Sequence, residues 1–238
     1  CLPGIYGRGH IPVVTGGTGF YVQALLRDID FTEEDSDGRY RAYLEDLAAR
    51  KGCACLHDML REVDPESAEA VHANNVKRII RALEYFHLTG ERISLHNERE
   101  RRKPSAYDSC YFVLNDERER IYAGIDRRVD EMLARGLVEE VERLRDMGCH
   151  RGMVSMQGLG YKEILAYLDG ETDLETAVVA IKRDTRHFAK RQLTWFRRER
   201  DIIWVDKAAF GYREEEILRF MSDTWAGRDK EKEAERRI

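Results

Sequence analysis

Three short apolar runs limit the folds open to this chain more than any other feature of its sequence. They occupy residues 11–15, 111–114 and 202–205, and each has the length and composition of a buried parallel strand. Most of the remaining sequence has the apolar periodicity of helices. We therefore predict a protein that is mostly α-helical, with few parallel strands in a small α/β core.

Helical patterns fill the interval between the first two runs, so we predict that this block is a large helical insertion. The predicted organisation is a first core part with a strand–turn–helix unit at 1–30, a helical inserted domain at 31–107, a second core part at 108–227, and a charged, disordered tail at 228–238. A buried first strand needs neighbours, and few residues precede it. We therefore suspect that the chain is a fragment.

The composition excludes several classes of function. The formal net charge is −5 at pH 7, so any contact with nucleic acid must come from a local basic patch. No run approaches the roughly 18 apolar residues that a membrane span needs, and we expect no membrane partner. The five cysteines are scattered and odd in number. They favour the reduced thiols of a cytoplasmic protein, and no pattern predicts a metal site.

The strongest local basic patch is the segment 185–197, TRHFAKRQLTWFR, which has a helical pattern. On a helix, one side would carry the cations Lys182, Arg186, Lys190 and Arg197. Most of the apolar side chains would lie on the other side, namely Ile181, Phe188, Leu193 and Phe196. This division predicts one face packed on protein and one face able to meet phosphates. A solvated basic face on an ordinary amphipathic helix is the alternative.

A glycine-rich turn, GGTG at 16–19, follows the first apolar run where a strand would feed a helix. Its N–H groups and hydroxyl could face a ligand at the end of the strand. It could equally be a tight turn with Thr18 as the helix N-cap. It is not a P-loop, because no Gly-Lys-Ser/Thr follows at the required spacing.

Other segments combine cations with different groups. Arg81 lies four residues after Lys77 and three after Arg78 on one helix. Cations at this spacing repel mildly, and an anion usually offsets the cost, either Glu84 or a phosphate. The segment 156–162, MQGLGYK, suits either a stacked base with its phosphate or a turn between helices. Alternating charges at 124–130 indicate a salt-bridged helix surface.

Four stretches in this order together resemble the tRNA dimethylallyltransferase family. They are 12–25 (PVVTGGTGFYVQAL), 76–90 (VKRIIRALEYFHLTG), 125–144 (IDRRVDEMLARGLVEEVERL) and 156–206, which includes QGLGYKE and TRHFAKRQLTWFR. The resemblance implies an α/β P-loop NTPase-like core with a large helical insertion, in a cytoplasmic, monomeric enzyme. It also implies transfer of a dimethylallyl group from dimethylallyl diphosphate to N6 of the adenine 3′-adjacent to the anticodon. The implied partners are the tRNA anticodon stem-loop and dimethylallyl diphosphate, with Mg²⁺ as cofactor.

The resemblance also implies roles for single residues. Thr18 would contact the flipped adenine, and Arg128 would stabilise the leaving diphosphate. Gly16 and Gly17 would belong to the cofactor site, and Arg41 would touch tRNA from the inserted domain. The other implied tRNA contacts are Lys77, Arg78, Ile79, Ile80, Arg81, Gln157, Gly158, Leu159, Gly160, Tyr161, Lys162, Thr185, Arg186, His187, Lys190, Arg191 and Gln192.

The sequence departs from the family pattern in three places. It contains neither the family P-loop nor the general-base Asp segment that follows it, and Gly124 stands where the family commonly has Arg. We therefore expect this chain alone to bind the anticodon arm weakly and to transfer nothing. An adenylate isopentenyltransferase acting on free nucleotides and a non-catalytic tRNA-binding remnant are the alternatives, and a helical scaffold protein is a third.

Overall fold

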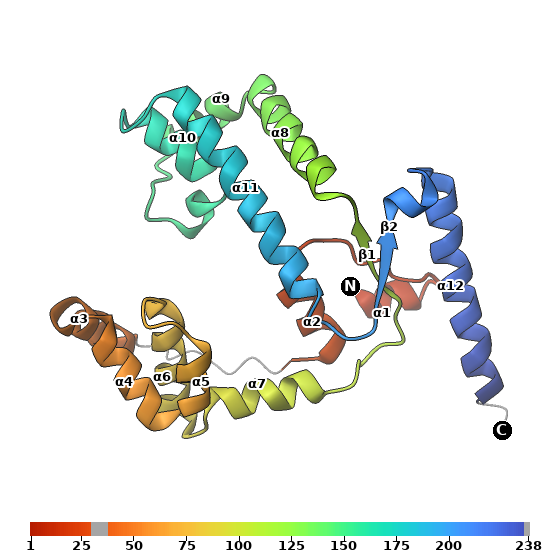
Figure 1. Cartoon of the computed structure of the whole chain (residues 1–238), viewed down its shortest axis with the longest axis horizontal. Helices are drawn as coiled ribbons and strands as arrows, with labels where there is room; N and C mark the ends of the chain where they lie inside the picture. Colours follow the sequence, from red (N-terminus) through yellow and green to blue (C-terminus); the bar gives the residue numbers. More distant parts are fainter. Residues whose placement is uncertain (30–37, 236–238) are drawn as a thin grey trace. The chain divides into compact units, whose positions relative to one another are not determined.

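The protein is mostly α-helical and contains one two-stranded parallel sheet, as a computed structural model shows (Figure 1). The structure describes residues 1–29 and 38–235. The chain divides into two compact units. The first unit contains residues 1–14 and 20–108, and the second contains residues 15–19 and 109–238. The predicted domain boundaries stay a prediction.

The first unit consists of short helices, four of which enclose an apolar core. The helices are α1 (Leu2–Tyr6), α2 (Gly19–Arg27), α3 (Arg39–Lys51), α4 (Cys53–Val63), α5 (Pro65–Ala70), α6 (Val76–Thr89) and α7 (Ile93–Arg102). The core is formed by α3 to α6, whose apolar faces meet; the buried residues are Leu44, Leu47, Leu56, Leu60, Ala68, Ile79, Ile80, Ala82 and Leu83. Spacings of three and four residues along each helix produce these faces.

Asp64 joins two helix N-termini in this unit. Its buried carboxylate accepts hydrogen bonds from the amide N and hydroxyl of Ser67 on α5, at 3.1 and 2.7 Å, and from the amide N and hydroxyl of Ser94 on α7, at 3.0 and 2.7 Å. Burial alone would raise the pKa of Asp64, but these four hydrogen bonds outweigh it and hold the pKa below its usual value. One carboxylate therefore caps both helices.

The second unit contains the sheet and a second helical core. Its elements are β1 (Tyr111–Asn115), α8 (Arg118–Ala134), α9 (Leu137–Asp146), the 3₁₀ turn η1 (Val154–Gln157), α10 (Tyr161–Leu168), α11 (Leu174–Phe196), β2 (Ile202–Asp206), η2 (Lys207–Phe210) and α12 (Glu214–Glu235). The helices α8 to α11 enclose the core residues Val129, Leu137, Val141, Met156, Ile164, Leu165 and Ile181. The strands pair in parallel, with Tyr111 opposite Ile202 and Asn115 opposite Asp206.

The first predicted strand is wrong. Residues 11–15 form no strand, and the side chains of Ile11, Val13 and Val14 are 60%, 83% and 55% exposed. The physical reason is that a single apolar run has no strand stability without a paired neighbour, and the sheet of the described residues contains only β1 and β2. The other two predicted strands are confirmed by β1 and β2.

Two long helical segments were not expected. Helix α7 includes the basic run near Pro104, and α12 continues through part of the tail that we predicted to be disordered at 228–238. Residues 30–37, at the predicted boundary between the first core part and the inserted domain, and residues 236–238 of the predicted tail lie outside the described residues.

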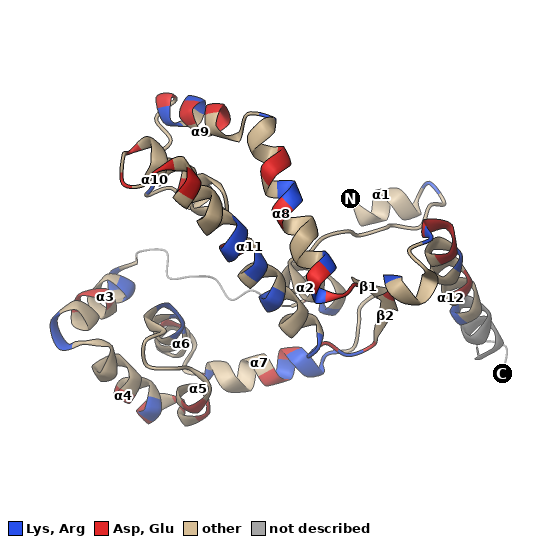
Figure 2. Ribbon diagram, turned by 45° about the horizontal axis from the view of Figure 1, so that its top comes forward, with Lys and Arg blue, Asp and Glu red and all other residues tan. Residues whose placement is uncertain are grey.

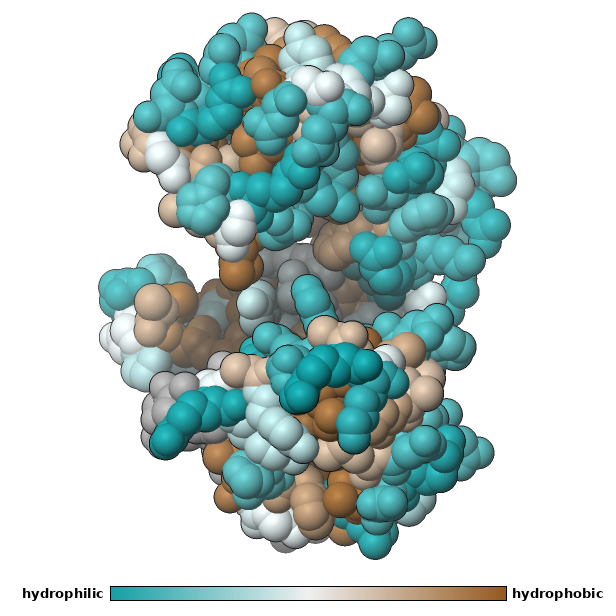
Figure 3. All heavy atoms as spheres, turned by 90° about the vertical axis from the view of Figure 1, so that its left-hand side faces the viewer, coloured by the Kyte–Doolittle hydropathy of each residue, from teal (hydrophilic) through white to brown (hydrophobic). Residues whose placement is uncertain are grey.

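Hydrophilic side chains cover most of the face shown in Figure 3, and hydrophobic side chains form small patches between them. In the part of the chain that the structure describes, no helix combines the length and the apolar character that crossing a bilayer requires.

Candidate functional site

The glycine-rich turn packs against the C-terminal end of α11. Gln192 on α11 donates a hydrogen bond from Nε2 to the carbonyl oxygen of Gly17, at 2.7 Å. A Cβ at position 17 would lie 3.2 Å from Cδ of Gln192 and closer still to its Nε2. A Cβ at Gly19 would lie 2.9 Å from Cγ of Trp195 and closer still to two other ring atoms. Close approach therefore requires glycine at position 19, where the indole ring is rigid, whereas at position 17 the amide of Gln192 would have to move aside.

This packing brings two predicted contacts together. Thr18 lies between the two tightly packed glycines, is exposed, and directly precedes α2, where an N-cap would stand. Gln192 belongs to the predicted tRNA-binding segment 185–192. Gly16 is exposed, with open space around it, and the carbonyl of Gly17 is occupied by Gln192. The second unit therefore places Thr18 beside the end of the basic helix.

The cationic face predicted for α11 is divided in the structure. Lys182 forms an ion pair with Asp130 of α8 at 2.6 Å, and Arg186 forms one with Asp126 of α8 at 3.0 Å. Lys190 is exposed. The sequence pattern assigned all these cations to one phosphate-facing side, which is wrong for the first two, because acidic residues of α8 neutralise them. Basic residues nevertheless remain prominent along α11 in Figure 2.

Phe188 also departs from the prediction. We expected it on the protein-facing side, but its side chain is 39% exposed, and the guanidinium of Arg191 lies 5.7 Å from its ring centroid. Ile181 and Phe196 are buried as expected. The exposed surface near the end of α11 therefore carries an aromatic ring as well as cations, and nucleic-acid bases stack on such rings.

The segment 157–162 forms a turn and a helix start. The side chain of Gln157 donates a hydrogen bond to the carbonyl of Arg151, and Gly160 has a positive φ of 98°. The amide N of Gly160 donates to Glu163 at 2.9 Å, which caps α10. Gly158 is exposed and Leu159 is half-buried. These contacts support the interhelical turn that the sequence left open.

The aromatic ring and the cation of this segment are also engaged. The hydroxyl of Tyr161 donates a hydrogen bond to Glu140, which raises the pKa of Tyr161. The ammonium of Lys162 lies 3.2 Å from Glu163 and 3.6 Å from Asp184. Thr185 donates its hydroxyl to the carbonyl of Ile181, and His187 is exposed. An RNA contact by Tyr161 or Lys162 would have to compete with these carboxylates.

A cavity of about 540 Å³ lies at the carboxyl ends of the two parallel strands. It is lined by Leu114, Asn115, Asp116, Arg120, Ile121, Ala123, Gly124, Arg127 and Lys207. In α/β folds, ligands bind at this edge of a parallel sheet. With three cations and one carboxylate, the lining has a formal charge of +2, which suits an anionic ligand.

Asp116 organises one wall of this cavity. Its carboxylate accepts a hydrogen bond from the hydroxyl of Tyr212 at 3.2 Å and lies 3.3 Å from the ammonium of Lys207. Burial would raise the pKa of Asp116, but the amide of Glu117, Lys207 and Tyr212 together lower it. Arg120 stacks on the ring of Tyr212, 3.9 Å from its centroid. Arg128, the predicted diphosphate contact, is exposed on α8, and its neighbour Arg127 is the arginine that lines the cavity.

In the first unit, the predicted anionic partner of the α6 cations is engaged elsewhere. Glu84 forms a bidentate pair with Arg41 of α3, at 2.9 Å from Nε and 2.7 Å from Nη2. Lys77, Arg78 and Arg81 are exposed, and no described residue forms an ion pair with any of them. Their charge is therefore available to an external anion, whereas the guanidinium of Arg41 fastens α3 to α6.

Two predicted tRNA contacts on α6 require correction. Ile79 and Ile80 are 0% and 4% exposed and belong to the apolar core of the first unit. Their side chains cannot meet RNA, because they hold α6 against its neighbours. The pattern VKRII is therefore a mixed one, in which the cations face outward and the isoleucines face inward.

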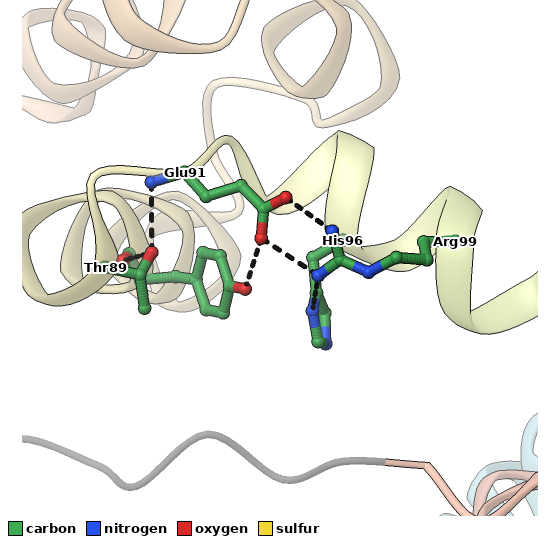
Figure 4. A network of polar contacts seen from close by, with 5 residues as sticks. Thr89, Glu91, His96 and Arg99 are labelled. Atoms are coloured by element: carbon green, nitrogen blue, oxygen red, sulfur yellow. Dashed lines mark hydrogen bonds and ion pairs between the residues drawn. The ribbon is translucent and has the colours of Figure 1, made fainter.

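The basic end of α7 is largely paired within the first unit. Glu91, just after α6, accepts two hydrogen bonds from Arg99 at 2.6 and 3.0 Å and one from Tyr85 at 3.2 Å; these contacts, with Arg99 first, lower its pKa (Figure 4). Thr89 accepts a hydrogen bond from the amide N of Glu91. Lys103 pairs with Glu100 at 2.7 Å. This network fixes the turn at Gly90, where φ is 70°.

Within residues 1–29 and 38–235, no group of three or more His, Cys, Asp or Glu side chains is arranged to hold a metal ion. All five cysteines are free thiols.

Comparison with known proteins gives the family. The sequence model of the IPP transferase family matches residues 1–199. The chain belongs to this family. The resemblance noted in the sequence is thereby confirmed. The chain is 61% identical over 203 residues to the tRNA dimethylallyltransferase of Lachnoclostridium phytofermentans and 46% identical over 206 residues to that of Acetivibrio thermocellus. These alignments cover 85% and 87% of this chain, and 65% and 66% of the two relatives.

Two solved structures share the fold. The tRNA isopentenylpyrophosphate transferase of Bacillus halodurans is 38% identical, with a TM-score of 0.64, and the match covers 98% of this chain and 72% of that protein. A eukaryotic dimethylallyltransferase acting on tRNA is 28% identical, with a TM-score of 0.67, and the match covers 86% and 53%.

Sequence reasoning missed three residues that position these surfaces. Trp195 fixes the glycine turn, Asp116 orders the cavity wall, and Asp64 caps two helices. Trp195 stood in a quoted motif without a role. The Asp64-Pro65 pair carried a usable signal, because Asp followed by Pro marks an N-cap and the first helical position.

Proposed function

We propose that the protein represented by this chain transfers a dimethylallyl group from dimethylallyl diphosphate to N6 of the adenine 3′-adjacent to the anticodon of tRNA. The observation that carries the proposal is the packing of the glycine turn on α11, through Gln192 and Trp195. It places Thr18, proposed to contact the flipped base, beside the proposed tRNA-binding helix. Family membership and relatives named for this activity support the same assignment.

In the proposed reaction, N6 attacks C1 of the allyl group, the bond from C1 to the diphosphate oxygen breaks, and diphosphate leaves. The adenine must first leave its stack. Negative charge grows on the leaving group, so cations there lower the barrier. The cavity lined by Arg120, Arg127 and Lys207 has the positive charge that this role requires. The family pattern assigns stabilisation of the leaving diphosphate to Arg128. A P-loop NTPase-like core is part of the proposal, since the cavity lies at the carboxyl ends of parallel strands.

The cofactor expected from the family does not fit the described residues. Mg²⁺ prefers carboxylate and phosphate oxygens, and Asp116, the carboxylate in the cavity, is already engaged by Lys207 and Tyr212. With no suitable group of ligands elsewhere among the described residues, we derive no step through a metal.

N6 must also lose a proton, and the general-base Asp segment of the family pattern does not occur in this sequence. We therefore propose that these 238 residues alone, as a cytoplasmic monomer, bind the anticodon arm without transferring the allyl group. The adenylate-specific alternative is not favoured, because the matched relatives are named for tRNA.

The test uses the purified 238-residue chain with an unmodified anticodon stem-loop, with adenosine monophosphate as the alternative acceptor, and with dimethylallyl diphosphate. We expect binding of the stem-loop that weakens steeply with salt, and no prenylated product. Absence of salt-dependent stem-loop binding would refute the proposed RNA role. Prenylation by this chain alone would refute its inactivity, and a preference for adenosine monophosphate would favour the free-nucleotide enzyme.

A further inference from the structure

Three aromatic rings on α3 and α6 form a stack at the surface of the first unit. The rings of Tyr40 and His87 lie almost parallel, 3.9 Å between centroids with a 14° angle between planes. The ring of Tyr43, also on α3, is stacked with that of Tyr40, with 6.1 Å between centroids and a 25° angle between planes. His87 is exposed and the side chain of Tyr43 is 50% exposed. Such rings usually complete a core, but two of these three stand in solvent.

A cavity of about 340 Å³ opens beside this stack. Tyr40, Phe86 and His87 supply aromatic walls, and Met59, Val63 and Leu83 supply apolar ones. Glu62 is the one carboxylate in the lining and is exposed. The volume stands at the lower end of the range for ligand pockets, about 300–1,000 Å³, which suits one small planar group. Apolar and aromatic walls with one carboxylate acceptor favour a heteroaromatic ring that carries an amino group.

The same unit supplies the charge that a nucleic-acid backbone needs. Lys77, Arg78 and Arg81 are exposed on α6, without an ion-pair partner among the described residues. Arg81 precedes His87 by six residues, which is about 9 Å along the helix axis. Aromatic rings and uncompensated cations on the same unit are the combination by which proteins hold single-stranded nucleic acid.

We propose that the Tyr40–Tyr43–His87 stack and its cavity form a second nucleobase site, which takes an unstacked base of the bound RNA other than the modified adenine. The base continues the aromatic stack, the apolar walls exclude water, and the Glu62 carboxylate accepts a hydrogen bond from an exocyclic amino group. The α6 cations hold the adjoining phosphates. This inference rests on the proposed function, because it assumes that the substrate is an RNA loop.

The test measures binding of the 238-residue chain to a fluorescently labelled anticodon stem-loop by anisotropy. His87→Ala should weaken binding about 5- to 100-fold, since one base–aromatic stack is worth that much by alanine substitution. Tyr43→Ala should weaken it by a smaller factor, because Tyr43 lies outside the cavity and supports the stack through Tyr40. His87→Phe should restore most of the affinity, because it restores the ring. Leu88→Ala is the matched control, since Leu88 is also exposed on α6 but does not line the cavity, and its affinity should stay within twofold.

The salt dependence separates a lost stack from a lost phosphate contact. The slope of log Kd against log salt should be unchanged in His87→Ala and reduced by about one in Lys77→Ala. Stem-loops that are abasic at one loop position at a time should identify a position, other than the modified adenine, where loss of the base weakens wild-type binding. With that stem-loop, His87→Ala should bind as tightly as the wild type. Wild-type affinity in Tyr43→Ala and His87→Ala would overturn the second base site and leave the proposed function intact.

A different result would identify failure of the proposed function itself. If the wild-type chain does not bind the stem-loop, the RNA role fails. Titration with adenosine monophosphate, followed through the NMR signals of the His87 ring, then decides the site separately. Shifts in the wild type that are absent in Tyr43→Ala would sustain a nucleobase site, and unshifted His87 signals would overturn it.

Discussion

Replacing Gly19 with alanine tests the packing on which the candidate site depends. The added Cβ would lie 2.9 Å from Cγ of Trp195 and closer to two further ring atoms, whereas ordinary carbon contacts are about 3.5–4.0 Å. The indole is rigid, and the adjacent Phe196 is buried, so the end of α11 or the turn must move. Overpacking of this kind costs about 1–3 kcal/mol, and the better helix propensity of alanine returns up to about 1 kcal/mol.

We therefore expect a net destabilisation of about 1–2 kcal/mol in Gly19→Ala. For a chain of this size, it corresponds to a melting temperature lower by about 2–8 °C, measured by circular dichroism at 222 nm. Gly16→Ala is the matched control, because a Cβ at position 16 meets open space, and its stability should stay within about 0.5 kcal/mol of wild type. Gly17→Ala should fall between them, since the flexible amide of Gln192 can move aside at the cost of one hydrogen bond.

The same variants separate folding from binding. Because the turn carries Thr18, Gly19→Ala should also weaken stem-loop binding at temperatures where the chain stays folded, whereas Gly16→Ala should not. If Gly19→Ala and Gly16→Ala melt together and bind equally, the turn does not pack on Trp195, and the reasoning that places Thr18 beside α11 is refuted.

Three further predictions concern other contacts. Asp64→Ala should lower the free energy of unfolding by about 2–4 kcal/mol in a urea titration, because two helix caps are lost together and Ser67 and Ser94 lose an acceptor; an effect below 0.5 kcal/mol would contradict this. Because the pKa of Asp64 is lowered by folding, its contribution to stability is complete above its unfolded pKa of about 4 and is lost as the pH falls through the folded pKa. The wild-type chain should therefore lose more free energy of unfolding on acidification than Asp64→Asn. Parallel plots of that free energy against pH for the two chains would contradict this. Gly124 lies in the interior of α8, and a Cβ there would meet open space, so Gly124→Ala should raise the melting temperature through a helix preference of about 0.5–1 kcal/mol. A lower melting temperature would mean that residue 124 is not helical or is closely packed.

The helices and two strands were predictable because their signals are local. Period-3.6 patterns predicted the largely helical content, and two of the apolar runs gave β1 and β2. The run at 11–15 failed because its apolar character shows a preference for burial and gives no information about a pairing partner. Helix α7 was missed because its charged sequence, ISLHNERERR, has little apolar periodicity, and its N-terminus depends on Asp64, 30 residues earlier than Ser94.

The candidate site was predictable only in part, for a related reason. Motifs name residue types, but charge pairing across helices decides which cations remain available. In the sequence, nothing distinguishes the paired cations Arg186 and Arg41 from the exposed cations Lys190 and Lys77. In the structure, Asp126 neutralises Arg186 and Glu84 neutralises Arg41. Burial decided the fate of Ile79 and Ile80 in the same way. The approach of Gln192 to Gly17 joins residues 175 positions apart, and no local pattern could give it.

We propose that the glycine turn and the end of α11 together surround the purine that receives the allyl group. Photo-cross-linking tests it most directly, with an anticodon stem-loop that carries a photoreactive purine at the position 3′-adjacent to the anticodon, followed by mass spectrometry of the digested complex. We predict cross-links to residues 16–19 and to residues 185–197 of the same chain. Efficient cross-linking that leaves both segments unmodified and marks other surfaces would contradict the account.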